Sequence, residues 1–197
     1  MKHRIYFFIV YFLFVFCNSY SQETQDETFI LGNKIYKKGA NWFKIGQGIG
    51  YHFWLSQVEY NTTFAYSFKV KNVYFQVGYH VSSDVFLTKP TLQRLNDIYF
   101  TLGHRKESRY FNLAAFGGIS YAYGGTLDHT EWKDGKLEKW YRGFTQPGLF
   151  GTIDITFKPL YDIGIGLSLY GSINKYYNIT GLQLHFYLSG AYKSTIE

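Results

Sequence analysis

The residues best suited to chemistry form the short motif His80-Val81-Ser82-Ser83-Asp84. A histidine close to a serine can act as a general base and make the hydroxyl a nucleophile toward an ester carbonyl. The competing interpretation is structural, because a histidine inside a protein often serves as a neutral hydrogen-bonding group. The position of the motif in the fold distinguishes the catalytic interpretation from the structural one.

Two other patterns could suggest a cofactor or a metal. The segment Gly46-Gln47-Gly48-Ile49-Gly50 resembles a dinucleotide fingerprint, but position 51, where the third glycine of that fingerprint would stand, is Tyr51 and no helical pattern follows. The three histidines at 52, 80 and 185 lie on separate segments, and we interpret them as hydrogen-bonded imidazoles. We therefore predict no cofactor and no metal site.

The N-terminal residues 1–21 have the pattern of a secretory signal peptide. A basic start with Lys2 and Arg4 precedes an apolar and aromatic run over 5–16, and small residues follow at Ser19 and Ser21. Export through the Sec pathway with cleavage before Gln22 is the prediction. A lipoprotein signal at the chain's single cysteine, Cys17, is disfavoured because the bulky Phe16 precedes it.

Removal of 1–21 would leave a chain without cysteine and would lower the formal charge from +6 to +4. Disulfides and cysteine metal sites are then excluded. The remaining positive charge is spread along the chain, which argues against a nucleic-acid partner. Residues 22–41 run from acidic to basic and include Gly32-Asn33, so they predict an N-terminal periplasmic tail that could contain a small hairpin, lid or plug.

The stretch from Ile163 to Tyr170 alternates large aliphatic residues with small or polar ones, which is the period of a β-strand with two different faces. The same alternation begins near Trp42 and predicts eight strands, over residues 43–53, 61–70, 73–81, 97–105, 110–123, 149–158, 163–170 and 182–189. The connections after the second, fourth and sixth strands are tight, those after the first, third and fifth are longer, and the one after the seventh is short again. This asymmetry is typical of outer-membrane barrels with short periplasmic turns and long external loops.

The longest connection, 124–143, predicts a hairpin around the Asp134-Gly135 turn that continues beyond the membrane as a ribbon. We interpret Trp132, Asp134, Gly135 and Trp140 as a candidate surface interaction loop, with the 82–96 loop as a second exposed segment.

Each predicted strand has an apolar face and a second face of small and polar residues. The composition of this second face indicates which of the two meets lipid. This face is rich in glycine and carries charges of both signs. An eight-stranded barrel has room inside only for side chains, so glycine relieves crowding there and opposite charges can pair across the lumen. The apolar face is therefore predicted to point outward, and a polar network is predicted in the lumen: Lys44, His52, Lys69, Gln76, His80, Asp97, Arg105, Asp154, Lys158 and His185. Aromatic residues near strand ends predict interfacial girdles: Trp42, Tyr51, Trp54, Tyr79, Tyr110, Tyr123, Tyr161, Tyr170, Tyr176 and Tyr192.

By this architecture, rather than by a shared motif, residues 42–192 resemble the small eight-stranded outer-membrane barrels of the OmpX and OmpA type. The resemblance implies an all-β, antiparallel, up-and-down transmembrane β-barrel, inserted by the barrel-assembly machinery and in contact with outer-membrane lipid and lipopolysaccharide. Members of that class commonly end on an aromatic residue, whereas here a tail of residues 193–197 follows Tyr192.

The His80-Val81-Ser82 motif also resembles part of the lipid A deacylase pattern. It departs from that pattern because Ser83 stands where the family has asparagine and no glutamate follows at a suitable distance. Strand parity also places His80 and Ser82 in the lumen. The expectation is a non-enzymatic outer-membrane protein with a structural or surface-interaction role and an extracellular partner of unknown identity. The alternatives are a lipid A-modifying enzyme (deacylase or acyltransferase type) and a secreted soluble β-barrel that binds a ligand.

Overall fold

The computed structural model describes residues 28–84, 93–133 and 136–195. The predicted signal peptide, most of the 82–96 loop, and the Asp134-Gly135 turn lie outside these residues. Within the described ranges, no helix has the length and apolar character needed to cross a membrane.

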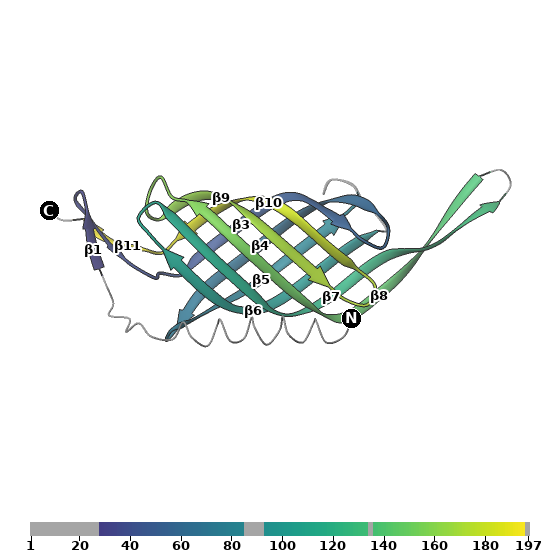
Figure 1. Ribbon diagram of the computed structural model, residues 1–197, viewed down its shortest axis with the longest axis horizontal. Helices are drawn as coiled ribbons and strands as arrows, with labels where there is room; N and C mark the ends of the chain where they lie inside the picture. Colours follow the sequence, from purple (N-terminus) through teal and green to yellow (C-terminus); the bar gives the residue numbers. More distant parts are fainter. Residues whose placement is uncertain (1–27, 85–92, 134–135, 196–197) are drawn as a thin grey trace, which may run out of the picture.

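Eight antiparallel strands close into a barrel in which each strand pairs with its neighbour in sequence and the last pairs with the first (Figure 1). The strands are β3 Trp42–His52, β4 Gln57–Val70, β5 Val73–Ser83, β6 Arg94–Glu107, β7 Phe111–Lys133, β8 Lys136–Phe157, β9 Ile163–Ile173 and β10 Asn178–Ser189. The predicted eight-stranded up-and-down barrel is confirmed. Several boundaries differ. β4 and β10 each begin four residues before the predicted position, and β6 begins three residues before it. The connection after β3 is shortened to residues 53–56, so the prediction that it is longer than the tight connections is wrong, since the connection after β8 covers residues 158–162.

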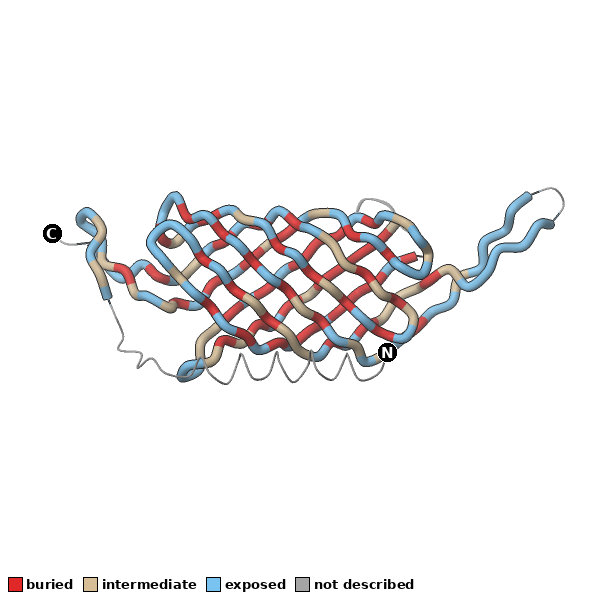
Figure 2. The backbone as a smooth tube through the Cα atoms, viewed as in Figure 1, coloured by how far each residue is buried: buried red, intermediate tan, exposed pale blue. Residues whose placement is uncertain are grey.

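Alternation of side chains across each strand produces the two faces of the barrel wall (Figure 2). In β9, Ile165 and Leu167 are exposed on the outer surface, whereas Ser168 and Tyr170 are buried inside. Large apolar side chains point outward from every barrel strand, for example Ile49, Phe64, Val77, Phe100, Ile119, Ile153, Leu167 and Leu184. The outer surface is therefore the apolar one, which is the arrangement suited to lipid.

Glycine is required where inward-facing groups approach the barrel wall closely. A Cβ atom at Gly78 would lie 2.2 Å from the Tyr99 phenol, and the Tyr99 ring stacks on Phe150 with 4.0 Å between centroids. A Cβ atom at Gly48 would lie 1.9 Å from the Leu182 carbonyl oxygen. Gly78 thus leaves space for a large luminal side chain, whereas Gly48 allows the close approach of the β10 backbone.

A second, three-stranded sheet lies beyond one end of the barrel, which we call the sheet end (Figure 1). It consists of β1 Thr28–Leu31, β2 Lys34–Lys37 and β11 Tyr192–Thr195. The predicted barrel end at residue 192 and the predicted tail over 193–197 differ from this arrangement, since β10 ends at Ser189 and β11 pairs with β2. A two-stranded hairpin is marginal alone, and this one gains a third strand and a small core around Tyr36, Tyr161 and Ala191.

The opposite end of the barrel, which we call the ribbon end, carries the extension of β7 and β8 (Figure 1). These strands pair with each other along their whole described length, but β6 pairs with β7 only as far as Gly125, and β9 pairs with β8 only from Leu149 onward. Residues 126–133 and 136–142 therefore form a two-stranded ribbon outside the barrel, interrupted by one register shift between Leu127 and His129. Residues 143–148 of β8 pair with residues 120–125 of β7, which belong to the barrel wall. The structure thus contains the predicted protruding hairpin.

Candidate functional site

Charged side chains fill the lumen at the sheet end. Arg105 Nη2 donates to Glu107 Oε1 at 2.7 Å, and Lys158 Nζ donates to the same oxygen at 2.6 Å. The Arg105 guanidinium lies 4.3 Å from the centroid of the Trp42 ring and also donates to the Tyr187 hydroxyl at 2.6 Å. Burial lowers the pKa of the Lys158 ammonium, and the Glu107 carboxylate opposes that shift. Glu107 is thus held between two cations.

A buried ion pair occupies the middle of the lumen. Lys44 Nζ donates to both carboxylate oxygens of Asp154 at 2.8 Å, and both side chains are 2 % exposed. Next to this pair, the two ring nitrogens of His185 hydrogen-bond to Thr156 at 2.9 Å and to Ser168 at 2.7 Å. The four strands that supply these residues, β3, β8, β9 and β10, are tied together across the interior.

A second buried carboxylate lies toward the ribbon end. Glu59 accepts hydrogen bonds from Ser82 Oγ at 2.9 Å, from Gln93 Nε2 at 2.9 Å and from the Tyr177 hydroxyl. Burial is the main cause that raises the pKa of Tyr177, so its phenol keeps its proton and remains a donor to Glu59. The His52 ring packs edge-on against Tyr177 with 4.1 Å between centroids. These contacts fill the lumen toward the ribbon end.

Nine of the ten side chains assigned to the luminal network are buried in the structure, and Lys69 is the exception. Lys69 is half-buried at the rim of the sheet end, 5.8 Å from the centroid of the Tyr74 ring. The structure brings together Lys44, Asp154 and His185, and separately Arg105 and Lys158. Elsewhere, Gln76 donates to Ser67 at 3.0 Å, His80 bonds Thr63 at 2.8 Å and Asp97 accepts from Ser172, while His52 lies at Tyr177.

Two carboxylates of this interior were missed in the sequence. Glu59 has the same parity as the luminal Asn61 and Thr63, so extending the predicted strand by two residues would have found it. Glu107 has the parity of Arg105, but it follows Lys106 and therefore resembles a charged turn.

The predicted aromatic girdle was wrong at three positions. Trp42, Tyr161 and Tyr170 are only 2–3 % exposed. Tyr170 has the inward parity of Ser168, and Trp42 lies under the Arg105 guanidinium. Tyr161, in the turn between β8 and β9, packs on Tyr36 of the small sheet.

The His80 and Ser82 pair is not arranged as a nucleophile and its base. His80 Nδ1 bonds Thr63 at 2.8 Å, whereas Ser82 Oγ donates to Glu59. Both side chains are fully buried inside the barrel, away from its apolar outer surface. Among the described residues, no group of three histidine, cysteine, aspartate or glutamate side chains could hold a metal ion.

The ribbon presents large apolar side chains without a core beneath them. Trp132 is 73 % exposed and lies opposite Leu137, so these two side chains share one face. The opposite face carries Trp140, whose ring stacks on His129 with 5.8 Å between centroids. At the base of the ribbon, Arg142 pairs with Asp128 at 3.1 Å. The candidate residues Asp134 and Gly135 lie outside the described residues.

No protein-family model and no curated protein matches this sequence. Among solved structures, the neisserial surface protein A NspA is 10 % identical with a TM-score of 0.54, over 76 % of this chain and 95 % of that chain. The N-terminal β-barrel domain of Pseudomonas aeruginosa OprF is 12 % identical, over 77 % and 100 % of the two chains, with a TM-score of 0.47. The attachment invasion locus protein Ail of Yersinia pestis is 10 % identical, over 78 % and 95 %, with a TM-score of 0.49.

At these identities the likeness concerns the fold. The chain has the fold of the small eight-stranded transmembrane β-barrels, as the resemblance to the OmpX and OmpA type implied. The outward apolar band and the polar interior agree with that class and not with a soluble barrel, whose apolar side chains would lie inside.

Proposed function

We propose that this protein is an integral outer-membrane β-barrel that conducts no solute and binds an extracellular partner through its ribbon. The observation that carries the proposal is the exposure of Trp132, Leu137 and Trp140 on a ribbon that lies wholly outside the barrel wall. Tryptophan side chains in such positions are common energetic centres of protein interfaces. In the proposed orientation the ribbon end faces the exterior and the sheet end faces the periplasm.

A passive pore is disfavoured by the packing of the lumen. Trp42, Tyr99, Tyr177 and Tyr187 are among the largest fully buried side chains. Trp42 and Tyr187 belong to one buried cluster, and Tyr99 and Tyr177 belong to another. Eight strands enclose an interior that side chains can fill. The barrel therefore serves as a rigid support that positions the ribbon.

The ribbon also offers unpaired backbone. Residues 126–133 of β7 and 136–142 of β8 pair only with each other, so each has one edge without a neighbouring strand among the described residues. An extended segment of a partner can add to such an edge through main-chain hydrogen bonds, while side-chain contacts supply specificity. The Trp132 and Leu137 face would provide the apolar part of that contact.

Site-specific labelling tests the location and orientation. In a Cys17→Ser background, Trp132→Cys should react with a membrane-impermeant maleimide on intact cells, whereas Lys34→Cys in β2 should react only after the outer membrane is opened. A heat-dependent shift of the unboiled protein on a denaturing gel should show that each variant is a folded barrel. Labelling of Lys34→Cys on intact cells would overturn the orientation.

Photo-crosslinking on intact cells tests the binding role. A benzophenone side chain at position 132 should form a discrete adduct on ultraviolet exposure, whereas the same group at position 131, on the other face of the ribbon, should form less. Cells should be examined both alone and after addition of a mixture of soluble extracellular proteins as a source of the partner. Equal, diffuse labelling from both positions in both conditions would count against a specific partner at the Trp132 face.

A further inference from the structure

The outer part of the ribbon places like charges opposite each other. Along the register of β7 and β8, Glu131 lies directly opposite Glu138, and two residues further out Lys133 lies directly opposite Lys136. Because side chains two residues apart point to the same side of a strand, all four lie on one face, which is the face opposite to Trp132. We call it the charged face. It has an acidic level, Glu131 and Glu138, and a basic level, Lys133 and Lys136, nearer the tip.

This arrangement does not stabilise the ribbon itself. Like charges directly opposite each other destabilise an antiparallel pair of strands, whereas opposite charges stabilise it. An exchange of Lys136 with Glu138 would place one acid and one base at each level without any change in composition. All four side chains are exposed, so each level presents two charges of one sign to the surroundings. A partner with the opposite signs at the same spacing could match both levels.

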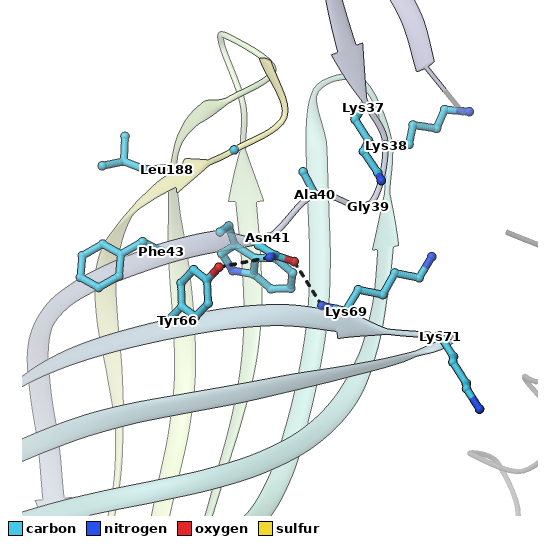
Figure 3. Close-up of a pocket in the computed structure, with 12 residues that line it drawn as sticks. Lys37, Lys38, Gly39, Ala40, Asn41, Phe43, Tyr66, Lys69, Lys71 and Leu188 are labelled. Atoms are coloured by element: carbon cyan, nitrogen blue, oxygen red, sulfur yellow. Dashed lines mark hydrogen bonds between the residues drawn. The ribbon is translucent and has the colours of Figure 1, made fainter. Parts of the chain in front are cut away.

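The charges at the sheet end differ, because they have partners within the chain. Lys37 and Lys69 line the pocket beside the segment between β2 and β3, and each of them has an interaction partner (Figure 3). In the same pocket Asn41 donates to the Tyr66 hydroxyl at 3.1 Å. In the part of the ribbon that the structure describes, the ion pairs are those of Asp128 at the base, and none involves the charged face. The charges of this face are therefore available to a second molecule.

A second copy of the charged face matches both levels in only one orientation. Identical faces related by a two-fold axis contact each other reciprocally. If two ribbons run antiparallel with the axis between the levels, the acidic level of each copy meets the basic level of the other. If two ribbons run parallel, as in two barrels of one membrane, each level meets its own sign. The charged face thus fits a copy in an opposing membrane and repels one in its own membrane.

We propose that the charged face binds the charged face of a second copy in an opposing outer membrane, so that the protein mediates adhesion between like cells. One such contact is small, well below the roughly 1,000 Å² that a stable interface buries, but many copies on two surfaces act together. At about 3.3 Å per residue, the antiparallel overlap holds the two barrel ends at most about 40 Å apart. This proposal rests on the proposed position of the ribbon outside the cell, but it uses neither the Trp132 face nor its partner.

Vesicle adhesion tests the proposal in the absence of surface sugars. The folded protein is inserted into phosphatidylcholine vesicles that carry one of two dyes, and two-colour aggregates are counted. Glu131→Lys/Glu138→Lys makes the whole charged face basic, and Lys133→Glu/Lys136→Glu makes it acidic. Neither variant should aggregate with itself, whereas a mixture of the two should give roughly tenfold more aggregates than either alone, because multivalency amplifies each weak contact.

The matched control exchanges the two levels within one chain, as Glu131→Lys/Lys133→Glu/Lys136→Glu/Glu138→Lys. Its composition and net charge equal those of the unmodified protein. Vesicles with this variant should aggregate with themselves but not with vesicles of the unmodified protein, because acidic levels would then meet acidic levels. Salt at about 1 M, where charges are screened beyond about 3 Å, should disperse all of these aggregates.

Three results would overturn the proposal. The first is that vesicles of the unmodified protein do not aggregate although maleimide labelling of Trp132→Cys, in the Cys17→Ser background, shows the ribbon on their outer surface. The second is equal aggregation of the unmodified protein with itself and with the exchanged variant. The third is self-aggregation of the all-basic or all-acidic variant. Heat-modifiability on gels shows that each variant has folded.

The outcome is separable from that of the proposed function. The vesicles contain neither the extracellular partner nor the cell envelope, so a negative result here leaves the binding role of the Trp132 face standing. Conversely, failure of crosslinking at position 132 does not change vesicle adhesion. On cells, an adduct between two copies has twice the mass of the chain, which distinguishes it from a different partner.

Discussion

Strands β7 and β8 pass through two environments, and the contrast separates the fold from the proposed function. Inside the barrel, Asn112 and Ala114 of β7 are about 1 % exposed because neighbouring strands and luminal side chains surround them. In the ribbon, Trp132 of the same strand is 73 % exposed. Pairing between β7 and β8 continues through both regions. The conformation of the barrel part is therefore determined by its interior contacts. The conformation of the ribbon depends on cross-strand pairs alone, so its sequence can change without affecting the barrel.

The largest effect is expected in the middle of the lumen. Asp154→Ala leaves the Lys44 ammonium buried without its carboxylate and should lower the free energy of unfolding by about 3–5 kcal/mol. The double variant Lys44→Met/Asp154→Leu removes both charges and should be considerably more stable than Asp154→Ala. Urea unfolding in detergent micelles measures both. Equal destabilisation by the single and double variants would contradict the importance of charge pairing.

Packing against the barrel wall should give the next largest effect. Gly78→Ala places a Cβ atom on the Tyr99 phenol and should destabilise the barrel by roughly 1–3 kcal/mol. The control is Gly117→Ala, because a Cβ atom at Gly117 meets nothing within 4 Å. Thermal unfolding followed by circular dichroism should separate the two variants, and equal melting temperatures would show that the Tyr99 ring moves aside freely.

A smaller effect is expected from Ser82. Ser82→Ala removes one donor to Glu59 and should cost about 1 kcal/mol, since the hydrogen bonds from Gln93 and Tyr177 remain. Mass spectrometry of lipid A should give the same acylation pattern with the unmodified protein, with Ser82→Ala and without the gene. A change in acyl chains that depends on Ser82 would restore the deacylase interpretation.

The smallest effect should come from the ribbon. Replacement of residues 128–141 by Asn-Gly should change the free energy of barrel unfolding by no more than about 0.5 kcal/mol, because in the described parts of the chain only β7 and β8 pair within that segment. The same variant should no longer co-purify with the partner that crosslinking at position 132 identifies. A large loss of barrel stability would mean that the ribbon helps to hold the wall together.

The fold could be predicted because the two-residue period records which face of a strand meets lipid. That period runs through β9 almost without interruption, so the inward position of Ser168 follows from the outward position of Leu167. The small sheet was less predictable, since its strands have four residues each and β11 pairs with a segment far away in sequence. Long-range pairing of such short strands leaves little periodic signal.

The luminal site could be predicted as a set of residues but not as pairs. Parity indicates that Lys44 and Asp154 both point inward, whereas their contact depends on barrel closure and on the levels that strand register assigns to them. Residue type and strand parity gave different predictions for Tyr170. Its aromatic side chain near a strand end suggested a place in the girdle, whereas its parity placed it inside, where the structure has it.

The pairing of β2 with β11 has a consequence for how the barrel closes. These strands immediately flank β3 and β10, the first and last strands of the wall, whose pairing forms the seam of the cylinder. Once Tyr36 and Tyr192 are paired, the two sides of the seam are tethered a few residues from where they meet, so the loop-closure entropy of forming it is lowered. The small sheet would thus hold β3 and β10 close together at the sheet end, where their pairing would begin. The remaining pairs of the seam would then form one after another from the sheet end.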